Sequence, residues 1–330
     1  MLEIHDLNYK IKTFSLTIKD LKIKNRCIHT ILGNSGAGKS TLLNLIAGHI
    51  EPLRGEILLN HNSIVKKKPN ERNIALIFQN SLLFPHMTVF ENISYALKIR
   101  KVKKDRIQNE VTLWLNRMDL IGYDNRMPNQ LSGGEKKRVA IARALITHPD
   151  LILMDEPLNG LDPKLRDEML DLIKEIQTKT SIAILYITHD FEEALKISDE
   201  ISVIKNGEII HSGPPSNLLF KPDDLSIIEF FTYYNTTNVI IKNKKFSLFN
   251  KTIETEKEGS YQCILPPQGV TITLGNAAEI IEKHYLKYGN IYCLKTKEDT
   301  FYAFSQEQYD VTTKVDYTIQ SKFINYQKEI

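Results

Sequence analysis

Hydrophobic residues in the first two thirds of the chain follow two alternating patterns. The strand-like run Ile28 to Leu32 and short continuous apolar runs, such as Ile74 to Phe78 and Leu151 to Met154, alternate with longer stretches in which apolar residues recur at helical spacing. A run without polar alternation is typical of a strand buried on both faces of a parallel sheet. The pattern over residues 28–205 therefore predicts an α/β domain, a largely parallel sheet with helices on both faces.

The segment from about residue 80 to 150 predicts a helical subdomain within this α/β domain. Its apolar residues at helical spacing are Ile107, Val111, Trp114, Leu115 and Met118. We interpret Trp114 as part of the core of this subdomain rather than as a ligand contact.

The pattern changes beyond about residue 235. Runs of β-branched and aromatic residues between polar turns predict strands at 239–242, 245–249, 261–265, 270–274, 291–295, 300–304 and 315–319, with a helix at 277–288. Ten of the 14 tyrosines but only four of the 15 glycines fall in residues 231–330. Because compositions that differ this much indicate separate domains, we expect one domain at 1–235 and a mostly-β one at 236–330, a small barrel in which the tyrosines pack.

Composition and charge exclude several classes of protein. With 42% hydrophobic and 25% charged residues, the chain has the composition of a globular protein, and it contains no run of about 20 apolar residues. The first ten residues lack an apolar signal core, so we expect a cytoplasmic location. The net charge of only +3 gives no electrostatic case for binding nucleic acid. Cys27, Cys263 and Cys293 lack metal-ligand spacing and are expected to be reduced, mostly buried thiols.

A glycine-rich motif follows the strand-like run Ile28 to Leu32 and precedes a helical pattern. It comprises Gly33, Asn34, Ser35, Gly36, Ala37, Gly38, Lys39 and Ser40, with Thr41 opening the helix. This is GxxxxGK[ST] between a strand and a helix, the context in which its backbone N–H groups surround a polyphosphate. We expect Lys39 to reach the β- and γ-phosphates of ATP and Ser40 to place its hydroxyl on Mg²⁺.

Polar residues end three other apolar runs. Asp155 and Glu156 follow one, His189 another and Gln79 a third. Because the carboxyl ends of parallel strands meet at one edge of a sheet, we expect these residues beside the bound phosphates. Asp155 is predicted to hold Mg²⁺ and Glu156 to act as base toward water, while His189 contacts the γ-phosphate and Gln79 contacts water or the metal shell.

A further motif, Leu131-Ser-Gly-Gly-Glu135, lies between the phosphate loop and the acidic strand. Taken alone it would be only a helix N-cap. In this order, however, the set resembles the nucleotide-binding subunit of ATP-binding-cassette (ABC) transporters over roughly residues 1–235. Residues 33–40 resemble the Walker A loop, Ser132, Gly133 and Gly134 the signature, and 151–156 the Walker B strand.

The resemblance extends to the fold, to further site residues and to partners. It implies a P-loop NTPase fold, a D-loop whose Asp162 contributes to the ATP site, a switch histidine at His189, and an aromatic residue that stacks on adenine. Tyr9 and Phe14 are candidates for the stacking residue, and Tyr9 is preferred. It also implies a head-to-tail homodimer with ATP between the Walker A loop of one copy and the signature of the other.

The resemblance is greatest to importers, in which such subunits lie on the cytoplasmic face of the membrane against permease subunits and work with an extracytoplasmic solute-binding protein. Pro266 and its neighbours faintly resemble a turn of the OB/TOBE-like barrels appended to importer ATPases. The cargo expected from this kinship is molybdate or tungstate, with iron(III), sulfate or thiamine as alternatives. Two other classes stay open, a soluble non-transport ABC ATPase and a regulatory ATP-binding module with little hydrolysis.

Overall fold

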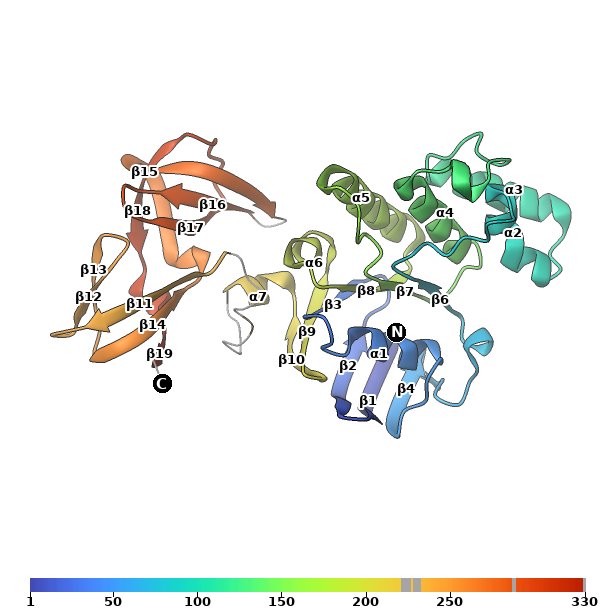
Figure 1. Ribbon diagram of the computed structural model, residues 1–330, viewed down its shortest axis with the longest axis horizontal. Coiled ribbons are helices and arrows are strands. Elements are labelled where there is room, and N and C mark those ends of the chain that lie inside the picture. The colour runs from blue at the N-terminus through green and yellow to red at the C-terminus, as the bar shows by residue number, and fades with distance from the viewer. Residues whose placement is uncertain (221–226, 228–232, 287–288, 329–330) are drawn as a thin grey trace. The chain divides into compact units, whose positions relative to one another are not determined.

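The computed structural model describes residues 1–220, 227, 233–286 and 289–328 (Figure 1). The chain divides into two compact units, Met1–Pro215 and Ser216–Ile330. The first unit ends before the domain boundary predicted near residue 235, and residues 221–226 and 228–232 of the intervening segment lie outside the described residues.

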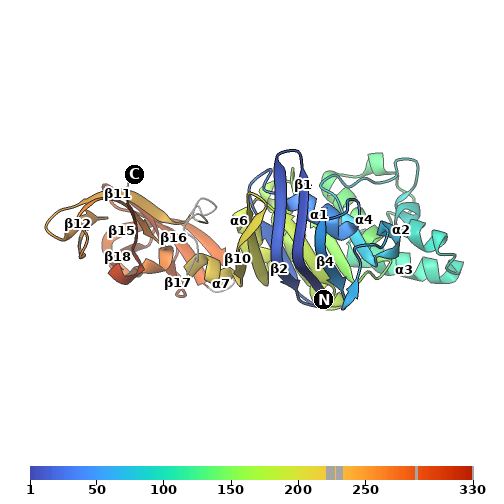
Figure 2. The same ribbon diagram turned by 90° about the horizontal axis from the view of Figure 1, so that it is seen from below.

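A ten-stranded sheet, in the order β5-β4-β1-β2-β10-β9-β3-β8-β7-β6, organises the first unit. The predicted parallel strands form its second half: β3 (Ile28–Leu32), β6 (Ile74–Ile77), β7 (Leu151–Asp155), β8 (Ala183–Thr188) and β9 (Glu200–Lys205). The strands with antiparallel partners, which the sequence did not predict, are β1 (Leu2–Ile11), β2 (Phe14–Ile23), β4 (Arg54–Leu59), β5 (Asn62–Ser63) and β10 (Glu208–Gly213). Strand β10 is antiparallel to β9 and parallel to β2. The long β1–β2 hairpin is seen from below in Figure 2.

Helices cover both faces of the parallel strands, which confirms the α/β prediction. Along β7, Leu151 and Leu153 pack into the core beneath α1 (Lys39–Ala47), whereas Ile152 and Met154 pack into the core shared with α5 (Pro163–Thr180). Figure 1 shows α1 on one side of β7 and β8 and α5 on the other. Burial on both faces is the reason that β7 is continuously apolar from Leu151 to Met154.

Helices α2 (Val89–Ile99), α3 (Lys104–Arg117) and α4 (Gly133–Leu145) lie within the segment predicted to be helical. Trp114 is 1% exposed in their common core, as expected. The other described helices are α6 (Phe191–Ile197) and α7 (Pro215–Phe220), with short 3₁₀ helices at Pro69–Glu71, Pro128–Gln130, Pro267–Gly269 and Ser321–Phe323. Every helix among the described residues is too short or too polar to span a lipid bilayer.

The second unit is β-rich, and its described residues form three sheets. Strands β11 (Asn235–Ile241), β14 (Gly259–Leu265) and β19 (Asn325–Lys328) make one sheet, and β12 (Lys245–Leu248) pairs with β13 (Lys251–Glu254). The third sheet has the order β17-β16-β15-β18, from Thr300–Ser305, Gly289–Lys295, Val270–Leu286 and Lys314–Ile319. Tyr292, Phe301 and Tyr317 lie in the core, so these aromatic residues pack as predicted, but the described strands are not joined into one closed barrel.

The helix predicted at 277–288 was wrong where the structure describes it. Residues up to Leu286 belong to β15, whose Ala278 and Ile280 are buried between exposed neighbours, while 287–288 lie outside the described residues. The helix-forming glutamates and lysine suggested a helix, but pairing with both β16 and β18 determines the conformation. Register shifts at Leu274/Ala278 and Ile280/Glu282 disturb the strict alternation that would have identified the strand.

Candidate nucleotide-binding and hydrolysis site

The phosphate loop connects β3 to α1, as predicted. Gly38 is the N-cap of α1 with a φ of 110°, in the region that favours glycine. A Cβ at this position would lie 2.9 Å from Cζ of Phe14 and 3.0 Å from Leu16, so the loop can approach the β1–β2 hairpin only with glycine here. The N–H groups at the start of α1 and the positive end of its dipole suit this loop to an anionic phosphate.

The Lys39 ammonium lies inside the loop and is 4% exposed. Its Nζ donates to the carbonyl oxygens of Gly33 at 2.7 Å and Asn34 at 3.1 Å, and lies 3.6 Å from Oε1 of Glu156. Burial lowers the pKa of Lys39, and the charge of Glu156 opposes this shift. The loop thus holds a cation where the polyphosphate of a nucleotide would bind.

Asp155 and Glu156 lie at the carboxyl end of β7, facing this loop. Ser40 Oγ donates to Asp155 Oδ1 at 3.3 Å, and burial raises the pKa of Asp155. Glu156 has a φ of 43°, an uncommon value for a non-glycine residue that is enriched at functional sites. Its N–H donates to the carbonyl of Ile187 in β8, which fixes the turn between the two strand ends.

The carboxylate of Glu156 is surrounded by side chains from three segments. Its Oε2 lies 3.2 Å from Nδ1 of His189 and accepts a hydrogen bond from Asn159 Nδ2 at 3.3 Å, while Oε1 faces Lys39. Asn159 was not predicted as a site residue. The sequence does place a polar side chain three residues after Glu156, and this spacing could have predicted that Asn159 reaches back to the carboxylate.

These groups surround a cleft of about 500 Å³ at the carboxyl ends of the parallel strands. It is lined by Phe14, Ser35, Gly36, Gly38, Lys39, Ser40, Thr41, Gln79, Asp155, Glu156, Asn159 and His189. The structure therefore brings together the predicted phosphate-loop lysine and hydroxyls, both acids, Gln79 and His189. Gly33, Asn34 and Ala37 belong to the loop but do not line the cleft.

The donor set of this cleft fits Mg²⁺ bound together with a polyphosphate. Ser40, Asp155 and Gln79 offer the oxygen ligands that Mg²⁺ prefers, and the first two are already in contact. Within the described residues, no three His, Cys, Asp or Glu side chains cluster as a metal site. The phosphates would therefore complete the coordination, as is usual for Mg²⁺.

The structure distinguishes the two aromatic candidates for adenine stacking. Phe14, the first residue of β2, lines the cleft and lies over Gly38. Tyr9 does not line the cleft; it is paired with Leu16 across the hairpin and packs against the core. The geometry thus favours Phe14 over the residue preferred from the sequence.

We expect Phe14→Ala to raise the Kd for ATP about 5-fold to 150-fold, the equivalent of the ~1–3 kcal/mol typical of stacking an aromatic ring on a base. The matched control is Tyr9→Ala, which should leave the Kd within about twofold. Titration with a fluorescent ATP analogue measures both. A larger loss of affinity in the Tyr9 variant would reverse the assignment.

The remaining predicted residues lie outside this cleft. Ser132 is the N-cap of α4, where its Oγ accepts from the N–H of Glu135 and its own N–H donates to Glu135 Oε2. Asp162 caps α5 by accepting from the N–H of Leu165 at 3.0 Å. Ser132, Gly133, Gly134 and Asp162 are therefore not brought to the nucleotide loop of their own chain.

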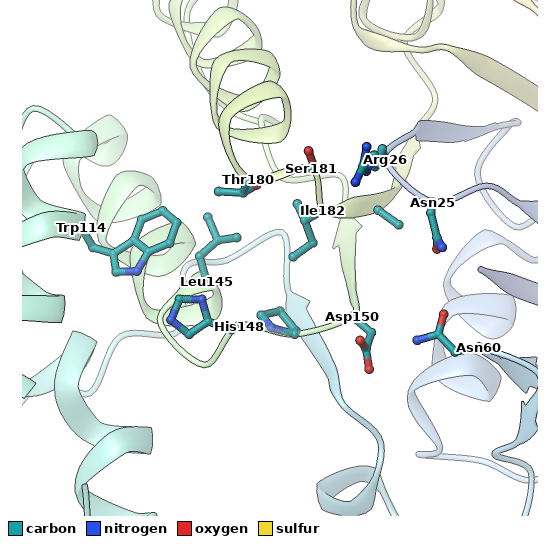
Figure 3. Close-up of a pocket in the computed structure, with 12 residues that line it drawn as sticks. Asn25, Arg26, Asn60, Trp114, Leu145, His148, Asp150, Thr180, Ser181 and Ile182 are labelled. Atoms are coloured by element: carbon teal, nitrogen blue, oxygen red, sulfur yellow. The ribbon is translucent and has the colours of Figure 1, made fainter. Parts of the chain in front are cut away.

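A second hollow, of about 300 Å³, lies at the amino-terminal ends of β7 and β8. Figure 3 shows Trp114 and Leu145 on one side of it and Asn25 and Asn60 on the other. It shares no lining residue with the cleft at the phosphate loop and contains none of the predicted site residues.

The chain is similar in sequence and in fold to known proteins. Residues 16–159 match the family model described as ABC transporter. A relative from Fusobacterium nucleatum, named Fe(3+) ions import ATP-binding protein FbpC, is 45% identical over 228 residues, which are 69% of this chain. The match spans 61% of the length of that protein.

Two solved structures are also similar. CbiO1 from Clostridium perfringens, described as part of the ABC transporter complex CbiONQ, has a TM-score of 0.63 and 30% identity, over 70% of this chain and 95% of that one. The ATP-binding cassette MJ0796, solved as a dimer in a post-hydrolysis state with ADP and Pi, has a TM-score of 0.57 and 29% identity, over 65% and 99% of the two chains.

Proposed function

Because the chain belongs to the ABC transporter family, as an ATP-binding protein of its ATPase class, we propose that it is the ATP-hydrolysing subunit of an import complex. The observation that carries the proposal is the meeting of Lys39, Asp155, Glu156 and His189 in one cleft beside the phosphate loop. A regulatory module with little hydrolysis would need neither the carboxylate base nor the histidine next to it.

The roles of the side chains follow from their positions. The N–H groups of residues 35–36 and 38–41 and the Lys39 ammonium bind the phosphates, and Phe14 stacks on the adenine. Glu156 orients a water molecule and takes its proton, while His189 holds the carboxylate and contacts the γ-phosphate. Ser40, Asp155 and Gln79 would hold Mg²⁺, which would neutralise charge on the phosphate oxygens.

We also propose that the active form is a head-to-tail homodimer. Ser132 and Gly133 are exposed and open α4, whose N–H groups and dipole end suit a phosphate, yet they do not reach the cleft of their own chain. A second copy would bring its signature, Ser132 to Gly134, to the γ-phosphate, with Asp162 close to the same interface. The dimeric state of the similar cassette MJ0796 supports this arrangement.

A groove of about 530 Å³ between β6, α2 and α4 would receive the membrane subunit. Apolar side chains line it and are left partly in water: Phe78 is 40%, Tyr95 36% and Ile99 62% exposed. Exposed apolar residues around a groove are typical of a surface that binds an amphipathic helix. The subunit would then lie on the cytoplasmic face of the membrane, and the complex would include an extracytoplasmic solute-binding protein.

For the cargo we propose iron(III), because a relative that is 45% identical is named as an iron(III) importer subunit. Molybdate or tungstate, the cargo expected from the sequence, finds no support among the relatives described above. The catalytic subunit does not touch the cargo, so its own cleft does not discriminate between these ions.

Uptake by the reconstituted complex tests the proposal. The full chain, co-expressed with its candidate membrane subunits and placed in proteoliposomes with the binding protein, should import iron(III) but not molybdate when ATP is supplied. Uptake of molybdate alone would reverse the cargo assignment. A chain that hydrolyses ATP but binds no membrane subunit would instead favour a soluble ABC ATPase.

The same complex tests the groove. Ile99→Asp places a charge on an exposed lining residue and should weaken the membrane-subunit contact by roughly 30-fold, the equivalent of about 2 kcal/mol for an interface anchor. Co-purification measures the effect. The control is Ile121→Asp, at a residue that is 74% exposed and does not line the groove, which should leave the complex intact.

A further inference from the structure

Lys137 on α4 connects two loops that border the catalytic cleft. Its Nζ donates to the carbonyl oxygen of Gln79 at 3.3 Å and to that of Pro157. Gln79 itself lines the cleft, and Pro157 directly follows Glu156. One ammonium thus joins the helix that begins with the signature, the loop after β6 and the turn after β7.

Lys137 is partly buried, and burial disfavours the charged form of its side chain. Burial lowers the pKa of Lys137, and the charge of Glu193 opposes this shift. No carboxylate pairs with Lys137 in the part of the chain that the structure describes, so the carbonyl oxygens are its hydrogen-bond partners. Both of these carbonyl oxygens belong to segments that border the catalytic cleft, so the position of the ammonium points to a role in holding those segments.

Arg143, further along α4, holds the other end of the same loop. Its guanidinium donates to the carbonyl oxygens of Ser81 and Leu82 and lies 5.3 Å from the ring centre of Phe84. The loop from Gln79 to Phe84 is therefore fastened to α4 at two points, and Lys137 is the one at the catalytic cleft.

We propose that Lys137 is a positioning residue for ATP hydrolysis, which keeps the Gln79 loop and the Glu156–Pro157 turn at a fixed separation from each other and from α4. This inference rests on the proposed function as an ATPase. It assigns Lys137 no contact with the nucleotide. Its effect arises because a shift of about 1 Å in the groups that orient the attacking water costs a large factor in rate.

Lys137→Met keeps the length of the side chain but removes the donors. We expect kcat for ATP hydrolysis by the full chain to fall about 10-fold to 100-fold, while KM for ATP stays within about twofold because the cleft lining is unchanged. Lys137→Arg, which retains the charge and the donors, should recover most of the rate. Lys179→Met, which removes an exposed ammonium paired only with Glu175 on α5, should behave as the wild type.

Hydrogen exchange gives a readout that does not depend on activity. In the nucleotide-free Lys137→Met variant, the amides of residues 79–84 should exchange faster than in the wild type, and those of α5 should not. A wild-type kcat with unchanged exchange would overturn the inference. A raised KM with an unchanged kcat would also overturn it, because it would assign Lys137 to binding instead.

The failure of this inference is distinguishable from that of the proposed function. If the wild-type chain and Glu156→Gln hydrolyse ATP equally slowly, the ATPase assignment fails. If the wild type hydrolyses ATP and Glu156→Gln does not, while Lys137→Met equals the wild type, only the role of Lys137 fails.

Discussion

Glu156→Gln is expected to reduce ATP hydrolysis by about 10²- to 10⁴-fold, the range typical for loss of a general base, while ATP still binds. Glutamine has the same shape, and its amide oxygen can still accept the hydrogen bond from Asn159 that Oε2 accepts at 3.3 Å. What it lacks is the basicity to take a proton from water. Release of inorganic phosphate measures the rate, and titration with a fluorescent ATP analogue measures binding.

In the proposed homodimer, ATP would join the two copies and hydrolysis would separate them, so the same variant should trap the dimer. Gel filtration with ATP should therefore show a dimer for Glu156→Gln and mostly monomer for the wild type. Glu168→Gln, an exposed acid on α5, is the matched control and should behave as the wild type in both assays. Turnover at the wild-type rate in Glu156→Gln would falsify the assignment of Glu156 as the base.

The parts of the site that the sequence predicted are those determined by local geometry. The phosphate loop needs glycine at positions of positive φ and must directly precede a helix, and both requirements are visible in residues 33–41. Asp155, Glu156 and His189 could be placed together because parallel strands bring their carboxyl ends to one edge. Neither the phosphate loop nor this grouping of side chains required knowledge of which strands are neighbours in the sheet.

The parts that the sequence did not predict depend on contacts between distant segments. Phe14 reaches the cleft because the register of the β1–β2 hairpin places it over Gly38, and this register is not apparent from aromatic residues at 9 and 14. Residues 277–286 contain good helix formers, yet pairing on both sides makes them strand. Lys137 looks like a solvated lysine in the sequence, because nothing local shows that two loops converge on it.

Residues that line the nucleotide cleft and residues outside it differ in what their replacement should reveal. Changes at the phosphate loop or at Glu156 test the reaction itself, because in the proposed mechanism these groups would contact the nucleotide or the attacking water. Changes at Lys137 test the positioning of the loops beside the cleft, so their effect should appear in kcat. Changes in the groove test binding of the membrane subunit, so their effect should appear in complex formation. Neither change should alter the affinity for ATP.

Lys39→Ala is expected to abolish ATP binding, with the Kd rising about 100-fold or more. The ammonium would make charge-assisted hydrogen bonds to the phosphates, each of which typically contributes ~1.5–3 kcal/mol. Its removal also leaves Glu156, now 3.6 Å from Nζ, as an uncompensated negative charge facing the γ-phosphate. Repulsion therefore adds to the lost attraction, so the double variant Lys39→Ala/Glu156→Gln should bind ATP more tightly than Lys39→Ala does.

This comparison separates the two contributions. Titration with the fluorescent analogue gives the Kd of each variant, and a thermal melt checks that the loop remains folded after the carbonyl oxygens of Gly33 and Asn34 lose their donor. Lys179→Ala, at an exposed lysine on α5, is the control for loss of a positive charge and should not change the Kd. Affinity retained in a folded Lys39→Ala variant would contradict the phosphate-loop assignment, since no other described lysine or arginine lines the cleft.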